Sequence, residues 1–145
     1  MAESMVTGTG ELTMKRILNY LATAGSFLYE EYGCIIFDSA YVNSFGGTGS
    51  VTLRNDRIEL NFWLDRDRIF IDIRGVARKK WYSMDILTAL FTGQLPETAE
   101  MNGCNTKFLK DRFSEIQNKF SSSEIESTES MCDKLKKKRA KEMFG

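Results

Sequence analysis

The chain of 145 residues contains no histidine, a single proline and only three cysteines. Without histidine, a catalytic triad with an imidazole base, an HExxH zinc site and imidazole acid–base catalysis are all excluded. Cys34, Cys104 and Cys132 are an odd number without CxxC spacing, which argues against a disulfide framework and against a structural zinc site. This cysteine usage is typical of a protein in a reducing compartment, so we expect a cytoplasmic location.

Long apolar runs and an excess of charge of either sign are also missing. No stretch approaches the roughly 20 apolar residues of a membrane span, and residues 1–10 lack the basic and apolar regions of a secretion signal. Lys plus Arg and Asp plus Glu are both 20, so the net charge is zero. We therefore expect a protein that is neither exported nor membrane-inserted and that has no general electrostatic attraction for nucleic acid.

What the chain does contain is enough apolar material for an ordinary core, since 42% of its residues are hydrophobic. The only proline, Pro96, lies in a polar stretch between Gly93 and Gly103, which is typical of a connection between elements. We predict a flexible N-terminus over residues 1–10, an α+β core domain over 11–100 and a C-terminal helical extension over 101–145.

Apolar residues recur at helical spacing over residues 11–32. This pattern predicts a long amphipathic N-terminal helix, or two helices divided at Gly25. Gly33 follows directly, which suits a left-handed cap at the helix C-terminus. The short apolar run Cys34–Phe37 then predicts a strand, and residues 38–49 have the composition of a loop or an irregular edge.

Apolar and polar residues alternate over three segments of residues 50–74. Period two of this length predicts an antiparallel meander with one buried face. Breaks at Asn55–Asp56 and at Arg66–Asp67 are suited to two-residue hairpin turns. The predicted pairs on the buried face are Leu53 with Ile58, Val51 with Leu60, Leu64 with Ile69 and Phe62 with Ile71.

The same register predicts which residues share the opposite face of the sheet. The expected neighbours there are Trp63 with Phe70, Asn61 with Asp72, and Glu59 between Thr52 and Arg74. An aromatic pair surrounded by charges of both signs is typical of a protein interface, in which aromatic residues anchor the contact and charges orient it. The alternative is that the first helix or the tail covers this face.

Helical spacing returns after the meander. Ser83 is a suitable N-cap for a helix near residues 83–92. Two helices are predicted beyond residue 101, and the last one is poorly apolar and expected to dock weakly. The sequence thus predicts an α+β fold with a long N-terminal helix, an antiparallel meander of three or four strands, and C-terminal helices.

Two carboxylates on one sheet face, Glu59 and Asp72, could act as an acid–base pair. Their predicted neighbours, Arg74 and Asn61, favour a cross-strand ion pair and a hydrogen bond instead. The chain carries no recognisable metal, nucleotide or cofactor motif, so we expect no cofactor and no enzymatic activity.

Basic clusters at Arg78–Lys80 and Lys136–Lys141 could contact nucleic acid, with aromatic residues such as Trp81 as stacking platforms. Residues 101–145 carry 10 basic and 7 acidic groups. Against this interpretation, the net charge is zero and the acidic residues of the sheet would repel phosphate. A terminal lysine cluster is also the usual composition of a solvated helix end.

A set of short motifs spans residues 27–91. The set consists of Phe27-Leu28-Tyr29-Glu30-Glu31-Tyr32-Gly33, Phe45-Gly46, Val51-x-Leu53, Ile58-x-Leu60-x-Phe62-x-x-Asp65-Arg66, Phe70-Ile71-Asp72-Ile73 and Trp81-Tyr82-x-x-Asp85. With these motifs the chain resembles a widespread group of small bacterial proteins, some of which are similar to the immunity proteins encoded beside polymorphic toxins. The similarity does not extend to residues 101–145.

The resemblance implies a protein that neutralises a cognate toxin by binding it, and the missing secretion signal favours a toxin that acts in the cytoplasm. The leading hypothesis is an immunity protein whose partner-binding residues are Trp63, Phe70, Asp65, Arg66, Asp67, Asp72, Glu59 and Arg74. The alternative is a small nucleic-acid-associated accessory protein that uses the basic tail, and an enzyme with a carboxylate pair is third. The sequence specifies neither the toxin nor the oligomeric state.

Overall fold

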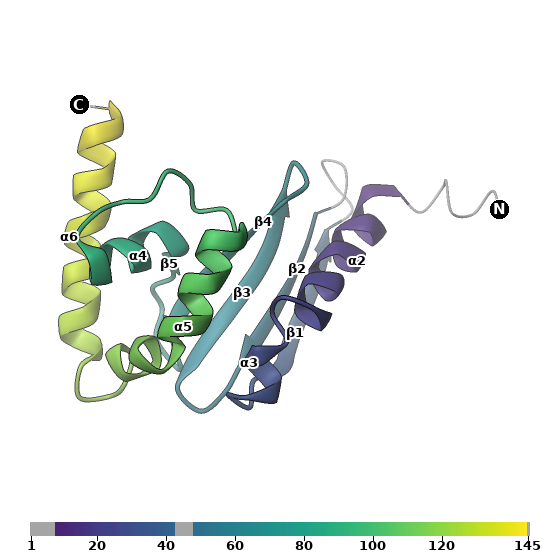
Figure 1. Ribbon diagram of the computed structural model, residues 1–145, viewed down its shortest axis with the longest axis horizontal. Coiled ribbons are helices and arrows are strands. Elements are labelled where there is room, and N and C mark those ends of the chain that lie inside the picture. The colour runs from purple at the N-terminus through teal and green to yellow at the C-terminus, as the bar shows by residue number, and fades with distance from the viewer. Residues whose placement is uncertain (1–7, 43–47, 145) are drawn as a thin grey trace.

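The computed structural model describes residues 8–42 and 48–144 (Figure 1). Five strands form one antiparallel sheet, side by side in their sequence order: β1 Ile35–Val42, β2 Thr48–Arg54, β3 Ile58–Asp65, β4 Arg68–Gly75 and β5 Tyr82–Ser83. The helices are α2 Gly8–Ala22, α3 Phe27–Glu30, α4 Met84–Thr92, α5 Gly103–Lys119 and α6 Ile125–Phe144. The predicted α+β class is confirmed. Residues 1–7 of the predicted flexible N-terminus and the motif Phe45-Gly46 lie outside the described residues.

The N-terminal helical region is divided, so the prediction of one long helix is wrong and the alternative of two helices divided near Gly25 is confirmed. α2 ends at Ala22, a turn follows, and α3 is a single turn. Gly25 permits this break, because its N–H bonds to the carbonyl of Tyr20 at 2.8 Å and a Cβ at position 25 would lie only 3.0 Å from the Tyr20 ring. Gly33 has a φ of 70°, which confirms the predicted left-handed conformation.

The sheet has five strands rather than three or four. β1 extends to Val42, into the stretch predicted to be a loop or an irregular edge, and the structure shows the second of these alternatives. As the edge strand it keeps polar residues such as Asp38 in water, and a bulge between Ile36 and Asp38 interrupts any alternation. The fifth strand, β5, has only two residues and pairs with the middle of β4.

The β3–β4 hairpin has the predicted register. Its pairs include Trp63 with Phe70, Asn61 with Asp72, Phe62 with Ile71 and Leu64 with Ile69. The turn consists of Arg66 and Asp67, whose φ values are 50° and 68°. Two successive positive φ values are the conformation of a type I′ turn, which matches the right-handed twist of the strands that it joins.

The β2–β3 hairpin is shifted by two residues from the predicted register. Leu53 pairs with Leu60 instead of Ile58, and Val51 pairs with Phe62 instead of Leu60. Asn55 explains the longer turn, because its side-chain oxygen accepts hydrogen bonds from the backbone N–H groups of Arg57 and Ile58. A shift of two residues leaves every side chain on its predicted face, since strand side chains alternate with period two.

The helices lie on one face of the sheet and at its β5 edge (Figure 1). α2 packs against β2 and β3, and α4 and α6 pack against each other beside β5. The strand residues predicted for the buried face are buried except Leu64 and Ile69, which are half-buried. The buried ones form one cluster with helical residues such as Leu28 and Phe113. In the described part of the chain, no helix is both long enough and apolar enough to cross a membrane.

Candidate partner-binding face of the sheet

We define the open face as the face of the sheet opposite the helices. The strand register arranges its residues in three rows across the strands. The aromatic row is Ala40, Ser50, Trp63 and Phe70; the polar row is Asp38, Thr52, Asn61, Asp72 and Ser83; the charged row is Ile35, Arg54, Glu59 and Arg74. Five of the eight predicted partner-binding residues therefore lie together on this face.

Trp63 and Phe70 form a stacked pair in the aromatic row. Their ring centroids are 4.7 Å apart and their planes differ by 21°. The Trp63 indole N–H donates a hydrogen bond of 3.1 Å to Oδ2 of Asp72, and the Arg68 guanidinium lies 5.6 Å from the centre of the Phe70 ring. Both rings are half-buried. The pair therefore presents aromatic surface to solvent in a fixed orientation.

Glu59 is the buried centre of the charged row, with 4% of its surface exposed. Nε and Nη2 of Arg74 donate hydrogen bonds of 3.1 and 3.0 Å to its Oε1, which confirms the predicted cross-strand ion pair. The same guanidinium lies 4.2 Å from the centre of the Trp81 ring. On the other side, Arg54 lies 3.8 Å from the centre of the Phe37 ring. The row consequently places three charged side chains between two aromatic rings, and these groups hold one another in place.

Asp72 lies between Asn61 and Ser83 in the polar row. Burial raises the pKa of the Asp72 carboxyl; the hydrogen bond from Trp63 opposes this shift, and the nearby charge of Asp85 adds to it. The predicted bond between Asp72 and Asn61 is wrong, because Asn61 instead accepts a hydrogen bond of 3.0 Å from Thr52. The predicted place of Glu59 next to Thr52 is also wrong, since Arg54 lies opposite Glu59.

The other three predicted residues, Asp65, Arg66 and Asp67, form the exposed tip of the β3–β4 hairpin. Arg66 and Asp67 have positive φ, a conformation that costs a residue with a Cβ about 1 kcal/mol and that glycine adopts freely. Arg16 of α2 donates a hydrogen bond of 3.1 Å to the carbonyl of Asp67. The tip thus keeps charged side chains at positions where glycine would be less strained.

Three further residues on the open face were not assigned to partner binding from the sequence: Phe37, Arg54 and Trp81. Arg54 follows the alternation of its strand, so the period-two pattern was a sufficient signal. Phe37 reaches this face through the bulge in β1, for which the sequence has no signal. The sequence predicts Trp81 as a stacking residue for nucleic acid and not as a partner-binding residue. The two tryptophans of the chain, Trp63 and Trp81, therefore both lie on the open face.

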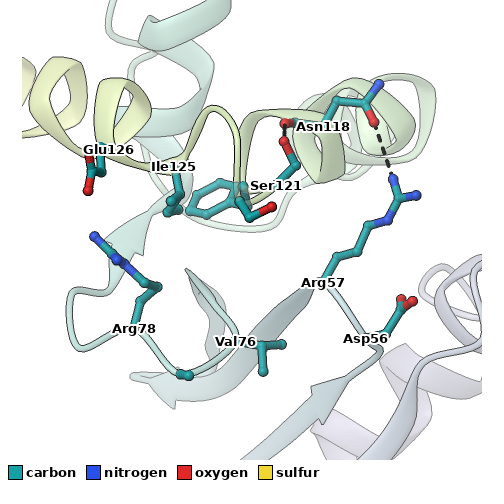
Figure 2. Close-up of a pocket in the computed structure, with 11 residues that line it drawn as sticks. Asp56, Arg57, Val76, Arg78, Asn118, Ser121, Ile125 and Glu126 are labelled. Carbon is teal, nitrogen blue, oxygen red and sulfur yellow. Dashed lines mark hydrogen bonds between the residues drawn. The ribbon is translucent and has the colours of Figure 1, made fainter.

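A polar pocket of about 800 Å³ lies where the β2–β3 turn, the β4–β5 connection and the α5–α6 turn meet (Figure 2). Arg57 reaches towards α5 and donates a hydrogen bond of 3.3 Å to Oδ1 of Asn118. Arg78 donates two hydrogen bonds, of 3.1 and 2.6 Å, to the carboxylate of Glu129. Glu126 adds an acidic group to the same lining. These charges offset one another, so the pocket favours neither an anionic nor a cationic ligand.

α6 is held by ion pairs and buried contacts, so the expectation of weak docking is wrong. Arg139 donates hydrogen bonds of 3.0 and 2.9 Å to the two carboxylate oxygens of Asp85. Lys80 binds Asp133 at 2.7 Å, and Cys132 is fully buried. The lysines of α6 that stay exposed are Lys134, Lys137, Lys138 and Lys141. Part of the predicted nucleic-acid surface is therefore occupied by contacts within the chain.

Within residues 8–42 and 48–144, no group of three His, Cys, Asp or Glu side chains lies close enough to hold a metal ion. No protein-family model, no curated protein and no solved structure matches the chain. The function of the protein is therefore inferred from the open face and from the chemistry of its residues.

Proposed function

We propose that this protein is a non-enzymatic immunity protein that neutralises a bacterial toxin domain by covering part of its surface with the open face. The observation that supports the proposal is the aromatic pair Trp63–Phe70 on the open face, with charges of both signs around it. The resemblance to a group of small bacterial proteins, some of which are similar to immunity proteins, fits this role, because neutralisation by binding requires a stable scaffold, an aromatic anchor and charges that match one partner.

The anchor residues are ordered before a partner arrives. Trp63 is held by its stack on Phe70 and by its hydrogen bond to Asp72, and Arg74 is held by Glu59. Fixing a flexible side chain during association costs about 0.5–1.5 kcal/mol, and anchors that are already fixed avoid this cost. Tryptophan and arginine are also among the residues that most often dominate the energy of an interface.

The hairpin tip supports a role in specificity. Asp65, Arg66 and Asp67 extend beyond the aromatic pair on the same hairpin, and all three are exposed. Charges at the rim of an interface mainly set the association rate and the choice of partner. A partner that complements both the tip and the aromatic pair would contact β3 and β4 along their length.

The proposal is tested by a growth assay with the product of the neighbouring gene. Expression of that product alone should stop growth, and co-expression of the wild-type protein should restore it. Trp63→Ala should weaken the complex by about 2 kcal/mol or more and reduce protection. Met131→Ala removes an exposed apolar side chain from α6 and should protect as well as the wild type.

Circular dichroism and thermal unfolding of each variant distinguish a loss of binding from a loss of folding. Phe70→Ala provides a second variant of the aromatic pair in case Trp63→Ala does not fold. A non-toxic neighbouring product, growth that the wild type does not restore, or full protection by both folded aromatic variants would contradict the proposal.

A nucleic-acid-associated role remains the second candidate because the exposed lysines of α6 follow one another at helical spacing. Three of these lysines, Lys137, Lys138 and Lys141, follow Lys134 by three, four and seven residues, so all four lie along one side of the helix. Binding to generic DNA that falls steeply with salt, and that weakens in Lys137→Glu, would support this role. An absence of binding at physiological salt would exclude it.

A further inference from the structure

The two edges of the sheet differ in which elements lie beside them. At one edge, β5 and the helices α4 and α6 lie beside β4, and the N–H of Met101 donates a hydrogen bond of 2.7 Å to the carbonyl of Ile69. At the other edge, β1 has a strand neighbour on one side only within the described residues. None of the described strands pairs with the outer backbone groups of β1, and these groups can hydrogen-bond to a further strand.

Large apolar side chains of β1 are exposed at this edge. Ile35, Ile36 and Phe37 have exposed fractions of 62%, 58% and 46%. Ile35 lies opposite Arg54 and so belongs to the open face, whereas Ile36 lies opposite Leu53 and faces the helical side. The edge is thus apolar on both of its sides. Natural sheets normally protect an edge with charge or proline, and β1 has one charged residue, Asp38, and no proline.

An apolar groove of about 460 Å³ adjoins the edge on the helical side. Leu18 and Ala22 of α2 and Tyr29 of α3 form one wall and Ile36 of β1 forms the other, while Ile35 borders the groove at the edge shared with the open face. Leu18 and Tyr29 are themselves exposed. None of the residues that line the groove is charged. A strand added to β1 would place alternate side chains in this groove while its backbone pairs with the edge.

The lack of charged residues in the groove favours a second copy of this chain as its occupant. In a two-fold symmetric contact the same patch meets itself, so a charged residue near the axis repels its own copy, whereas an uncharged apolar patch is self-complementary. Interfaces between identical chains are also more apolar than transient ones. The chain has zero net charge, so two copies do not repel each other over long range. We propose that two copies of this chain associate through antiparallel pairing of β1, with Ile36 of each copy against the groove residues of the other.

Such a dimer is compatible with a partner on the open face. Antiparallel strands at the junction of two sheets are related by an axis perpendicular to the sheet, so the helices of both copies lie on one side and both open faces lie on the other. The bulge between Ile36 and Asp38 limits how much of β1 can pair regularly. The dimer is independent of the proposed function, because its formation requires no toxin.

The test is the molar mass of the full chain in solution as a function of concentration, by sedimentation velocity and light scattering. The wild type should form a dimer. Ile36→Lys should raise the dimer dissociation constant by at least about tenfold, because it places two like charges near the axis. Met131→Lys makes the same change at an exposed apolar residue of α6 and should leave the dimer unchanged. Ile35→Lys is the second edge variant in case Ile36→Lys does not fold.

Hydrogen exchange locates the contact. The β1 amides should exchange more slowly in the concentrated wild type than after dilution, and this protection should be absent in the folded edge variants. A wild type that is monomeric at every concentration, or a dimer that survives both folded edge variants, would overturn the proposal. Protection of β1 that arises only when another protein is added would also overturn it and would assign the edge to a strand of that protein.

Discussion

Glu59 and Asp72 are carboxylates on adjacent strands of the open face, and each is held by a different donor. Glu59 is bound by the guanidinium of Arg74, whereas Asp72 is bound by the neutral indole N–H of Trp63. A buried ion pair is often no more stabilising than apolar residues of the same size, but the loss of one partner is costly because the other charge stays buried. The stability of the face therefore depends on the pairs being complete.

Arg74→Met should lower the free energy of unfolding by about 2 kcal/mol, because it leaves Glu59 buried without its cation. Arg54→Met is the matched control, since Arg54 lies opposite Glu59 on the other neighbouring strand and has its guanidinium over Phe37. Urea unfolding of both variants measures the difference. Equal losses in the two variants would show that the ion pair does not hold the face together.

Asp72→Asn should make the protein more stable at neutral pH. Burial raises the pKa of Asp72 in the folded protein, so the folded state holds this proton more tightly than the unfolded chain does. Stability is therefore lost as the pH rises from the unfolded-state pKa of aspartate, about 4, through the raised folded-state pKa. Asparagine cannot ionise and still offers Trp63 an acceptor, so the variant avoids this loss.

The pH dependence of thermal unfolding checks the Asp72→Asn prediction. The advantage of the variant should shrink as the pH is lowered and should vanish below the unfolded-state pKa of about 4, where the wild-type carboxyl becomes protonated in both states. Asp65→Asn, at the exposed hairpin tip, should change stability little at any pH. A variant that is less stable than the wild type at neutral pH would indicate that the charged form of Asp72 stabilises the fold.

At the scale of the elements, the β3–β4 hairpin combines a stable register with a strained turn. The double change Arg66→Asn and Asp67→Gly should raise the free energy of unfolding by about 1 kcal/mol, because asparagine and glycine are the residues that a type I′ turn prefers. The same change removes two charges from the tip and should weaken binding to the partner. The control, Arg66→Lys with Asp67→Glu, keeps charge and strain and should alter neither property. A turn variant that is more stable and binds unchanged would remove the tip from the interface.

α6 depends on its ion pairs for docking, and Cys132 reports on that docking. Burial, together with the nearby charges of Asp133 and Glu129, raises the pKa of the Cys132 thiol to about 12, so a thiol reagent should modify it slowly in the folded protein. Arg139→Ala leaves Asp85 without its cation and should speed the modification of Cys132. The exposed Cys104 should react at the same fast rate in both proteins. Equal slow rates at Cys132 would show that the Arg139 pair does not hold α6.

The elements differ in how well the sequence predicts them, and the reasons are physical. The β3–β4 register follows from period two and a two-residue turn, because both are local. The β2–β3 register depends on the Asn55 side chain, which bonds to its own turn and lengthens the connection. β1 past Phe37 has no alternation to detect, since an exposed edge strand places no constraint on which residues face water. The sequence indicates a possible break at Gly25 and leaves one helix or two as alternatives; the close approach of Gly25 to Tyr20 in the packed structure explains why two helices form.

At the scale of the whole molecule, the helices cover one face and one edge of the sheet, and no helix of the described residues covers the other face or the other edge (Figure 1). The open-face residues of β2, β3 and β4 could be predicted from alternation alone, including Trp63, Phe70 and Asp72. Whether a helix covers that face could not be predicted, because it depends on the side of the sheet to which each connection returns the chain. The edge at β1 could not be predicted either, since no local pattern marks the end of a sheet.

The central claim is that the open face binds a protein partner, and a nuclear magnetic resonance titration tests it most directly. Trp63 and Trp81 give two indole N–H signals, and both indoles lie on the open face. On addition of the neighbouring gene product to ¹⁵N-labelled protein, both indole signals and the amide signals of β3 and β4 should shift or broaden, while those of α6 stay in place. Changes confined to α6 or to the helical side, with both indole signals unmoved, would contradict the claim.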